Sequence, residues 1–432
     1  MDNTKNDTRT RLSRRGFLLG TATAAGTAIL AACGGGSATS APAATSAPAA
    51  TTAATAAATK AAAAPTTGAA ATAAVTAPAS TPATAASTNG TAAPAAGATT
   101  GSGSTVAAAM VGTAPKPEKS KITIAVGGQD QFIYLPVTLA NQLGYFKMLG
   151  LEVEIANFSG GAKAAEALVG GSADMVCGFY DHTQQVQPKG ETLKTVVLYD
   201  QFPGIDLVVG TKGGADIKGW ADLKGKTVGI SSAGSSTNTF LNFNLVKNGV
   251  KIDDVMIVPV GTGATAIAAL ENNKVQAAML TDPAITKMAN DGTGRVLWET
   301  RTQKDTVDAF GGPYPAGGLY LSQDFITKNP GTTQAAVTAS VMTLKYIQTH
   351  TPEEIAGKMP AEFYGGDKNL YIQALKASIP LFSPDGIFPE AGSQSVYNVL
   401  KQFDPDVMKA MSINLPNTYS NQFVMAALQT VK

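Results

Sequence analysis

Short apolar runs alternate along the chain with longer stretches in which apolar residues recur at helical spacing. In the first cycle the apolar runs predict strands at residues 122–126, 151–155, 173–177, 195–198 and 207–210. Helices are predicted between them at 135–148 and 162–169. Strands that alternate with helices indicate a parallel sheet covered by helices on both faces.

A second cycle of the same pattern begins near Trp220. It predicts strands at 227–231, 255–258, 276–280 and 296–298, with helices at 235–248, 264–272 and 283–290. A Gly/Pro-rich segment, 311–318, interrupts the cycle, and the apolar residues 319–321 are expected to rejoin the first sheet. Further helices are predicted at 332–348, 352–358, 368–377, 393–402 and 420–431.

The fold class is therefore α/β, with two Rossmann-like lobes and a helical C-terminal coat. The chain is expected to cross between the lobes at the glycine-rich segments 210–214 and 311–318. A few residues in such segments can absorb the backbone rotation of a closing motion, so the crossings predict a hinge.

The N-terminal quarter of the chain lacks this pattern. Residues 37–115 are Ala, Thr, Ser, Pro and Gly except for Lys60, Val75, Asn89, Val106, Met110 and Val111. A stretch with one charge and no aromatic residue cannot bury enough apolar surface to offset its ordering entropy. The sequence predicts a disordered linker over 34–117 and a folded body of a little over 300 residues after it.

The first 33 residues are typical of an export sequence. Ser13-Arg14-Arg15-Gly16-Phe17-Leu18 resembles a twin-arginine motif, and the following apolar run, 16–32, is too short and too rich in small residues to span a membrane comfortably. The run ends in Leu30-Ala31-Ala32-Cys33, which resembles a bacterial lipoprotein box. We expect a signal peptide over 1–33 and lipidation of Cys33, which would hold the protein on the outer face of the cytoplasmic membrane. The alternative is an uncleaved anchor.

Charge and cysteine content exclude several classes of protein. The whole chain has a formal charge of +1, but from residue 116 onward it carries 26 basic and 29 acidic residues, which argues against a nucleic-acid-binding body. The two cysteines and two histidines have no metal-ligand spacing, so no metal is expected. A dinucleotide fingerprint is matched by Gly261-Thr262-Gly263-Ala264-Thr265-Ala266. Because this segment lies in the second lobe of an exported chain, we do not expect it to bind NAD. There is no P-loop motif, and no cofactor is expected.

Several segments, taken in this order and spacing, resemble the substrate-binding proteins of ABC importers. The resemblance is to the nitrate/sulfonate/taurine/thiamine-precursor group. It is carried by residues 144–147, 158–161, 166–174, 222–229, 266–278 and 281–283. It implies the type II periplasmic binding protein fold, with lobe one at 118–209 and 318–432 and lobe two at 210–317. It also implies a monomer that passes a small solute to an ABC permease and its ATPase subunit.

Ligands of open α/β sheets bind beyond the carboxyl ends of the strands. That rule selects the loops 128–132, 159–161, 179–182, 231–238, 261–263 and 281–282. From these loops we expect the ligand-binding residues to be Gln129, Asp130, Ser159, Gly160, Gly161, Tyr180, Asp181, Ser232, Gly234, Ser235, Ser236, Thr262, Thr281 and Asp282.

The chemistry of these loops suits an anion or a ligand rich in hydrogen-bond groups. Ser159-Gly160-Gly161 permits close approach to the start of a helix, where backbone N–H groups favour negative charge; the alternative is a helix cap without a ligand. The segment 232–237 offers similar donors from the other lobe. Two carboxylates, Asp181 and Asp130, disfavour a small dianion and suit a ligand with donors, although Asp181 could simply cap a helix and Tyr180 could simply pack.

The expected function is capture of a small organic or anionic solute outside the cytoplasm, of the sulfonate, nitrate, taurine or pyrimidine-like class, for an ABC importer. No catalytic residue is expected. Two alternatives stay open: an enzyme similar to thiamine-pyrimidine synthases of the same superfamily, and a ligand sensor for a membrane receptor. The synthases carry a cysteine-rich iron motif, and Cys177 is the only cysteine besides Cys33.

Overall fold

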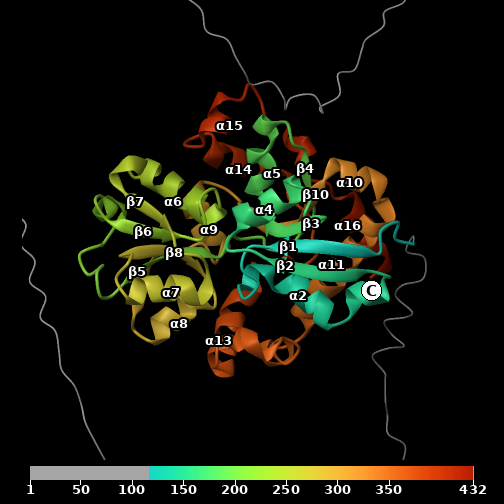
Figure 1. The fold of residues 1–432 in the computed structure, drawn as a ribbon, viewed down its shortest axis with the longest axis horizontal. Coiled ribbons are helices and arrows are strands. Elements are labelled where there is room, and N and C mark those ends of the chain that lie inside the picture. The colour runs from blue at the N-terminus through green and yellow to red at the C-terminus, as the bar shows by residue number, and fades with distance from the viewer. Residues whose placement is uncertain (1–115, 432) are drawn as a thin grey trace, which may run out of the picture. The chain divides into compact units, whose positions relative to one another are not determined.

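The computed structural model describes residues 116–431. The expected signal peptide, Cys33 and nearly all of the expected linker lie outside these residues. Within them, ten strands form two five-stranded sheets, one on each side of the view in Figure 1. We call the part built on the first sheet lobe one and the part built on the second sheet lobe two. The expectation of an α/β fold with two sheets is confirmed.

Lobe one is built on the sheet with strand order β2-β1-β3-β10-β4. Its strands are β1 (Lys121–Val126), β2 (Glu152–Asn157), β3 (Met175–Phe179), β4 (Leu193–Leu198) and β10 (Gly317–Ser322). β1 pairs in parallel with β2 and β3, whereas β10 is antiparallel to β3 and β4. The chain therefore returns to the first sheet at the apolar residues where the sequence predicted it.

Lobe two repeats this arrangement with the strand order β7-β6-β8-β5-β9. Its strands are β5 (Ile205–Gly210), β6 (Thr227–Ile230), β7 (Met256–Pro259), β8 (Ala277–Thr281) and β9 (Gly294–Trp298). β6 is parallel to β7 and β8, and β5 is antiparallel to β8 and β9. Each sheet thus holds four strands that run in one direction and one reversed strand, β10 or β5, inserted between the last two of them.

The first crossing between the lobes lies earlier than the expected 210–214. β5, which we assigned to lobe one, pairs with β8 and β9 of lobe two, so the chain crosses at residues 199–204. All six residues of β5 are buried, and apart from Asp206 they form a mostly apolar run that has the same sequence pattern in either sheet. The second crossing, residues 299–316, ends at Gly317, where β10 begins.

The helices cover both sheets and continue into the C-terminal coat. The α-helices are α2 (Leu135–Gln142), α3 (Tyr145–Met148), α4 (Gly161–Val169), α5 (Asp181–Gln185), α6 (Ser236–Lys247), α7 (Gly263–Glu271), α8 (Ala284–Asn290), α9 (Gln303–Phe310), α10 (Gln323–Lys328), α11 (Pro330–Thr349), α12 (Pro352–Ala356), α13 (Lys368–Ser378), α14 (Glu390–Leu400), α15 (Pro405–Lys409) and α16 (Gln422–Thr430). Short 3₁₀ helices are η1 (Phe132–Tyr134), η2 (Gln187–Lys189), η3 (Trp220–Leu223), η4 (Ile252–Asp254), η5 (Ala361–Tyr364), η6 (Ile379–Leu381) and η7 (Leu415–Asn417). The five helices predicted after residue 330 are all present, whereas α5, α9, α10 and α15 were not predicted.

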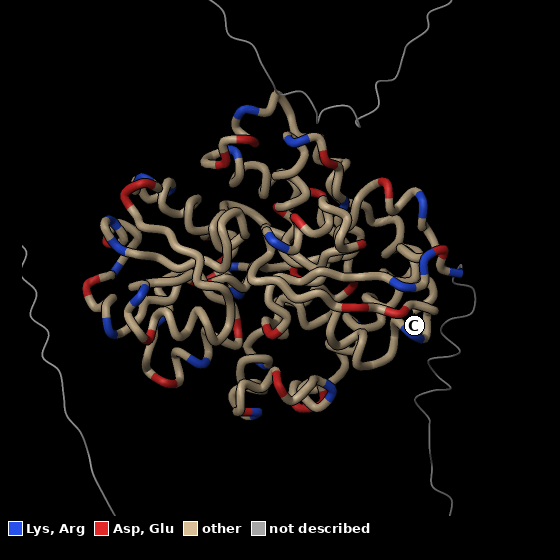
Figure 2. The backbone as a smooth tube through the Cα atoms, viewed as in Figure 1, with Lys and Arg blue, Asp and Glu red and all other residues tan. Residues whose placement is uncertain are grey.

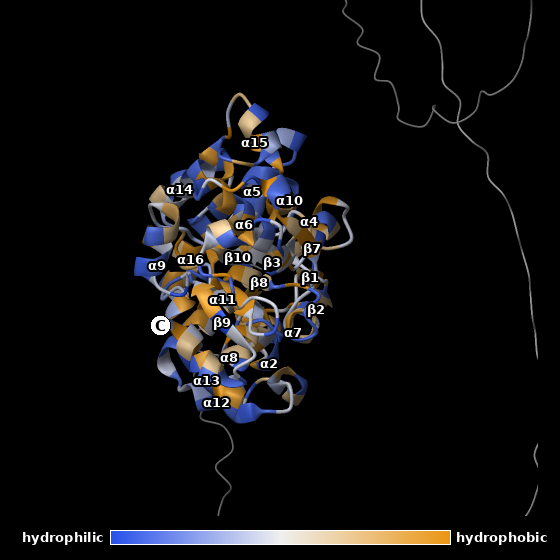
Figure 3. Ribbon diagram, turned by 90° about the vertical axis from the view of Figure 1, so that its left-hand side faces the viewer, coloured by the Kyte–Doolittle hydropathy of each residue, from blue (hydrophilic) through white to orange (hydrophobic). Residues whose placement is uncertain are grey.

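Alternation along the strands divides the core of lobe one between two faces. Ile124 of β1 belongs to the large apolar cluster that includes residues of α2 and α11. Its neighbour Ala125 points to the other face and packs with alanines of α4. In Figure 3 the apolar residues concentrate on the strands and on α11. Helices on both faces fix the strand ends, and with them the loops beyond those ends.

Charged residues of both signs are spread over both lobes (Figure 2). No helix within residues 116–431 is both long enough and apolar enough to cross a membrane.

Candidate functional site

The carboxyl ends of the parallel strands from the two sheets face one another between the lobes. A small cavity lies there, with a volume of about 20 Å³, which is about the space that one water molecule requires. It is lined by residues from both lobes: Gly127, Gln131, Ile133, Tyr134, Gly161, Phe179, Ile205, Ser231, Ser235, Ser236, Thr237 and Thr281. Most of the polar groups among them are hydroxyls, and none of these lining residues is a lysine or an arginine.

Four hydrogen bonds join the lobes around this cavity. The backbone N–H of Ala162 donates to Ser235 Oγ (3.1 Å), and the Ser236 hydroxyl donates to Asp181 Oδ1 (2.8 Å). On the other side the Thr281 hydroxyl donates to Gln131 Oε1 (2.6 Å), and the backbone N–H of Phe132 donates to the Asp282 carbonyl (3.2 Å). The structure is therefore the closed arrangement of the two lobes.

Gly160 makes the close approach of the lobes possible, and Gly127 permits a close backbone approach within lobe one. A Cβ on Gly160 would lie 2.5 Å from Ser232 Oγ and 3.0 Å from Ser235 Oγ, both in lobe two. A Cβ on Gly127 would clash with the backbone of Gly160 and Gly161. A side chain at residue 160 would force the lobes to separate or these serines to rotate, so glycine here favours the observed contact between the lobes.

Helices α4 and α6 both begin at the cavity. Gly161 of α4 and Ser236 of α6 line it, and the first-turn N–H groups of a helix form a partially positive end. Neither N-cap residue caps its own helix with a side chain, since Ser235 Oγ accepts instead from Ala162 in α4 of the opposite lobe. One hydroxyl of lobe two thus caps a helix of lobe one, and the arrangement can stabilise negative charge.

Two fully buried carboxyl groups interact with residues that line the cavity: Asp181 with Ser236, and Asp200 with Tyr134. Asp181 accepts hydrogen bonds from Ser236 and, at 3.4 Å, from Tyr314 of the second crossing. Burial raises the pKa of Asp181, although His182 and the hydroxyl donors oppose this effect. Burial also raises the pKa of Asp200 well above its ordinary value, and neither oxygen of that carboxyl has a hydrogen-bond partner among the described residues. A raised pKa favours the uncharged form of both groups.

Asp200 was absent from the expected site. It lies two residues beyond the end of β4, so the rule that selected the other loops would also have selected it. Its backbone N–H donates to the Gly317 carbonyl and its own carbonyl accepts from Ala316 N–H, both at 2.9 Å. Asp200 therefore joins the two crossings between the lobes.

A third carboxyl group, that of Asp130, makes a contact between the lobes outside the cavity. The position of a Cβ on Gly263 overlaps its Oδ2, so the carboxyl group packs directly on the first residue of α7. Burial raises its pKa. Nearby, the hydroxyl of Thr262 lies against Gly128 in the same way.

The fourteen expected residues divide into three sets. Gly161, Ser235, Ser236 and Thr281 line the cavity. A second set lies in the contact between the lobes without lining it: Asp130, Gly160, Asp181, Ser232, Gly234 and Thr262. The remaining four, Gln129, Ser159, Tyr180 and Asp282, have side chains directed elsewhere.

Each of these four side chains has another environment. The Tyr180 hydroxyl shares a 2.5 Å hydrogen bond with Thr418 Oγ1, and its ring lies 4.3 Å from that of Phe388. Asp282 accepts from Thr286 and faces the Arg301 guanidinium at 3.3 Å. Gln129 donates to Thr138, and Ser159 is exposed. Being in the right loop did not determine where these side chains point.

Eight lining residues were not among the expected ones. Gln131, Phe179, Ser231 and Thr237 lie in the selected loops, but their side chains were not singled out. Ile133 and Tyr134 enter through η1, which the sequence did not predict, and Ile205 enters because β5 belongs to lobe two. Gly127 directly follows β1 and faces Gly161.

Among residues 116–431, no group of three or more His, Cys, Asp or Glu side chains is placed to hold a metal ion. Cys177 lies fully buried in β3, and burial raises the pKa of its thiol well above the ordinary value.

A family profile described as NMT1/THI5 like matches residues 131–355. A solved structure from Bordetella bronchiseptica RB50 is 40% identical in sequence, with a TM-score of 0.70 over 73% of this chain and 99% of that one. No match was found among curated proteins.

Two more distant solved structures share the fold. One is the alkanesulfonate-binding protein SsuA from Xanthomonas axonopodis pv. citri bound to MOPS, with 18% identity and a TM-score of 0.56 over 70% of this chain and 99% of that one. The other is the periplasmic nitrate-binding protein NrtA from Synechocystis PCC 6803, with 14% identity and a TM-score of 0.59 over 74% and 90%.

Proposed function

Because the chain belongs to the NMT1/THI5-like family and has the fold of periplasmic binding proteins, we propose that it captures a small solute between its lobes for an ABC import system. The observation that carries this proposal is the cavity between the lobes. Strand ends of both sheets and the N-termini of α4 and α6 meet there, and residues from each lobe supply its hydroxyls.

We expect the groups that join the lobes by hydrogen bonds to be the ones that bind the solute. In the closed arrangement Ser235, Ser236 and Thr281 are bonded to partners across the cleft. A solute larger than one water enters only after these bonds open, and it then offers its own polar atoms to the same groups. Binding shifts the balance toward closure only by the difference between the solute's affinities for the closed and open forms.

The solute class that we propose is small and polar or anionic: a sulfonate, nitrate, taurine or a pyrimidine-like compound. The helix N-termini support an anion. The carboxyl groups of Asp181 and Asp200 repel an anion less than ionised carboxylates would, because burial raises the pKa of each and so favours its uncharged form. In the uncharged form each can donate one hydrogen bond.

We further propose export by the twin-arginine route and a lipid anchor at Cys33, with the ABC permease and its ATPase as partners and a monomer as the working form. The motifs at 13–18 and 30–33 support the export route and the anchor. The permease and ATPase follow from the proposed class of protein.

Neither alternative function gains support from a particular observation. A synthase with a cysteine-rich iron motif needs accessible thiols, whereas Cys177 is buried with a raised pKa. A ligand sensor would use the same cleft. The same binding site would therefore serve either transport or sensing. Measurement of solute uptake by cells that lack this protein distinguishes these two functions.

The test of solute capture is calorimetry of the purified protein against nitrate, taurine, alkanesulfonates and aminopyrimidines, together with mass spectrometry of small molecules released on denaturation. Ser235→Ala removes the hydroxyl that bridges the lobes and should weaken binding roughly 2- to 12-fold, since a lost hydrogen bond costs about 0.5–1.5 kcal/mol. Ser172→Ala is the matched control, because that hydroxyl donates to Ala167 far from the cleft. Equal affinities in the two variants would contradict the proposed site.

A further inference from the structure

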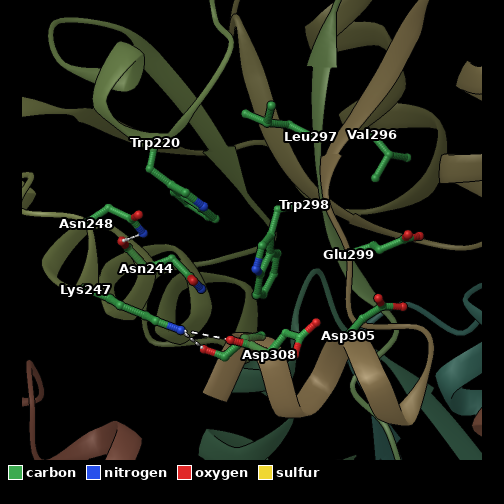
Figure 4. Close-up of a pocket in the computed structure, with 11 residues that line it drawn as sticks. Trp220, Asn244, Lys247, Asn248, Val296, Leu297, Trp298, Glu299, Asp305 and Asp308 are labelled. Carbon is green, nitrogen blue, oxygen red and sulfur yellow. Dashed lines mark hydrogen bonds between the residues drawn. The ribbon is translucent and has the colours of Figure 1, made fainter. Parts of the chain in front are cut away.

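A second pocket lies within lobe two, between η3, the C-terminal half of α6, β9 and α9 (Figure 4). Its volume is about 440 Å³, which is within the range of small-molecule sites. None of its eleven lining residues lines the cavity between the lobes. The pocket is therefore separate from the proposed solute site.

Both tryptophans of the chain line this pocket. Trp220 enters from η3 and Trp298 from the end of β9, with ring centroids 5.6 Å apart and planes at 78°. Both side chains are half-buried, and Trp298 rests on Phe310 of the core at 5.9 Å. A large aromatic surface thus borders the pocket, and Phe310 of the core supports it on the side away from the pocket.

The polar atoms around this surface include both donors and acceptors. No hydrogen bond joins either indole N–H to another of the residues drawn in Figure 4. Asn244 and Asn248 use their amide N–H groups on backbone carbonyls one turn earlier, both at 2.8 Å, which leaves their side-chain oxygens as acceptors. Glu299 and Asp305 each add one carboxylate oxygen, since Glu299 Oε2 is paired with Arg301 and Asp305 Oδ2 accepts from Thr302.

We propose that this pocket binds a saccharide. A sugar ring has an apolar C–H face that can stack on an indole, and its hydroxyls both donate and accept. It can use the indole N–H groups, the asparagine oxygens and the carboxylates at the same time.

Other ligand classes use fewer of these groups. An organic cation gains from the indole faces and the carboxylates, but it cannot accept from the two indole N–H groups. Three carboxylates, Glu299, Asp305 and Asp308, oppose an anion, and the single lining cation, Lys247, already donates to the backbone carbonyls of residues 308 and 309. A purely apolar ligand would bury amide and carboxylate oxygens without partners.

The two tryptophans make the test direct, because the tryptophan emission of the full chain, excited selectively over its tyrosines, arises from this pocket. The probes are glucose, N-acetylglucosamine and their β-linked disaccharides, with glycerol and tetramethylammonium as comparisons. We expect a saturable change in emission for the sugars, at lower concentration for the disaccharides, because the pocket exceeds the volume of one ring. No saturable change up to about 100 mM, or a response to tetramethylammonium alone, would overturn the proposal.

Two asparagines form a matched pair of variants that keeps both fluorophores. Asn248 ends α6 and Asn272 ends α7, and each donates at 2.8 Å to the carbonyl four residues earlier. Asn248→Ala should weaken the sugar response about tenfold, whereas Asn272→Ala should leave it unchanged. Equal responses of the two variants would place the sugar elsewhere and overturn the proposal.

Discussion

The substitution Gly160→Ala tests whether closure of the two lobes creates the solute site. A methyl group at this position would lie 2.5 Å from Ser232 Oγ, 3.0 Å from Ser235 Oγ and 3.1 Å from Ser231 Oγ, all across the cleft. Ordinary van der Waals contacts begin near 3.4 Å, so the lobes must separate or the serines must rotate. Rotation of Ser232 would break its 2.6 Å hydrogen bond with Ser235.

The expected magnitude follows from these contacts. Overpacking in a well-packed contact costs about 1–3 kcal/mol. Only the closed form bears this cost, because Gly160 meets lobe two only on closure. The dissociation constant for the solute should therefore rise roughly 5- to 150-fold, at about 1.4 kcal/mol per factor of ten.

The unliganded fold should be little affected, because Gly160 has φ 174° and ψ 162°, an extended conformation that alanine adopts without strain. Gly219→Ala is the matched control: Gly219 is also an extended N-cap residue, and nothing lies within 4 Å of its Cβ position. Calorimetry gives the affinity, and small-angle scattering with and without solute gives the compaction. If Gly160→Ala binds and compacts like Gly219→Ala, closure at this contact does not build the site.

Three further predictions concern other parts of the chain. Burial raises the pKa of Asp200 in the folded protein, so the folded chain holds a proton there that the unfolded chain releases, and the free energy of unfolding should fall as pH rises above the unfolded pKa of about 3.9. In denaturant titrations Asp200→Asn should show a smaller fall in this free energy between pH 5 and 8 than the parent protein, and identical pH profiles would contradict the prediction. A truncation that starts at Lys116 should unfold cooperatively and keep the parent's solute affinity, because Glu118 still accepts from the backbone N–H groups of Gly331 and Thr332 at the start of α11; loss of a cooperative thermal transition would refute that boundary. Cys33→Ala should abolish labelling by a radioactive fatty acid, and normal labelling would rule out the lipid anchor.

The strand and helix pattern was predictable because alternation and helical spacing are local properties of the sequence. Which sheet a strand joins is not local. β5 is uniformly buried, so nothing in its own residues distinguishes pairing with β8 from pairing within lobe one. That one ambiguity is why the first crossing was predicted later in the chain than the structure places it.

The loops of the site were predictable from the strand ends, but the side chains that line the cavity were not. Tyr180 and Asp282 lie in the expected loops, and each turns away to partners that are distant in sequence or that belong to another element: Thr418 for Tyr180, Arg301 for Asp282. Asp200 follows a strand in the same way as Asp181, and applying the loop rule to β4 would have found it. Tyr134 enters through a single 3₁₀ turn, which leaves little pattern in the sequence.

The hydrogen bonds between Asp200 and residues 316–317 place the two ends of lobe two side by side. Lobe two is thus a domain inserted into another domain at a single point. All its strands lie within residues 205–298, whereas the sheet of lobe one stays incomplete until residues 317–322 have been made. During synthesis the inserted lobe can complete its sheet first, and β4 obtains its neighbour in the sheet only after the chain has returned.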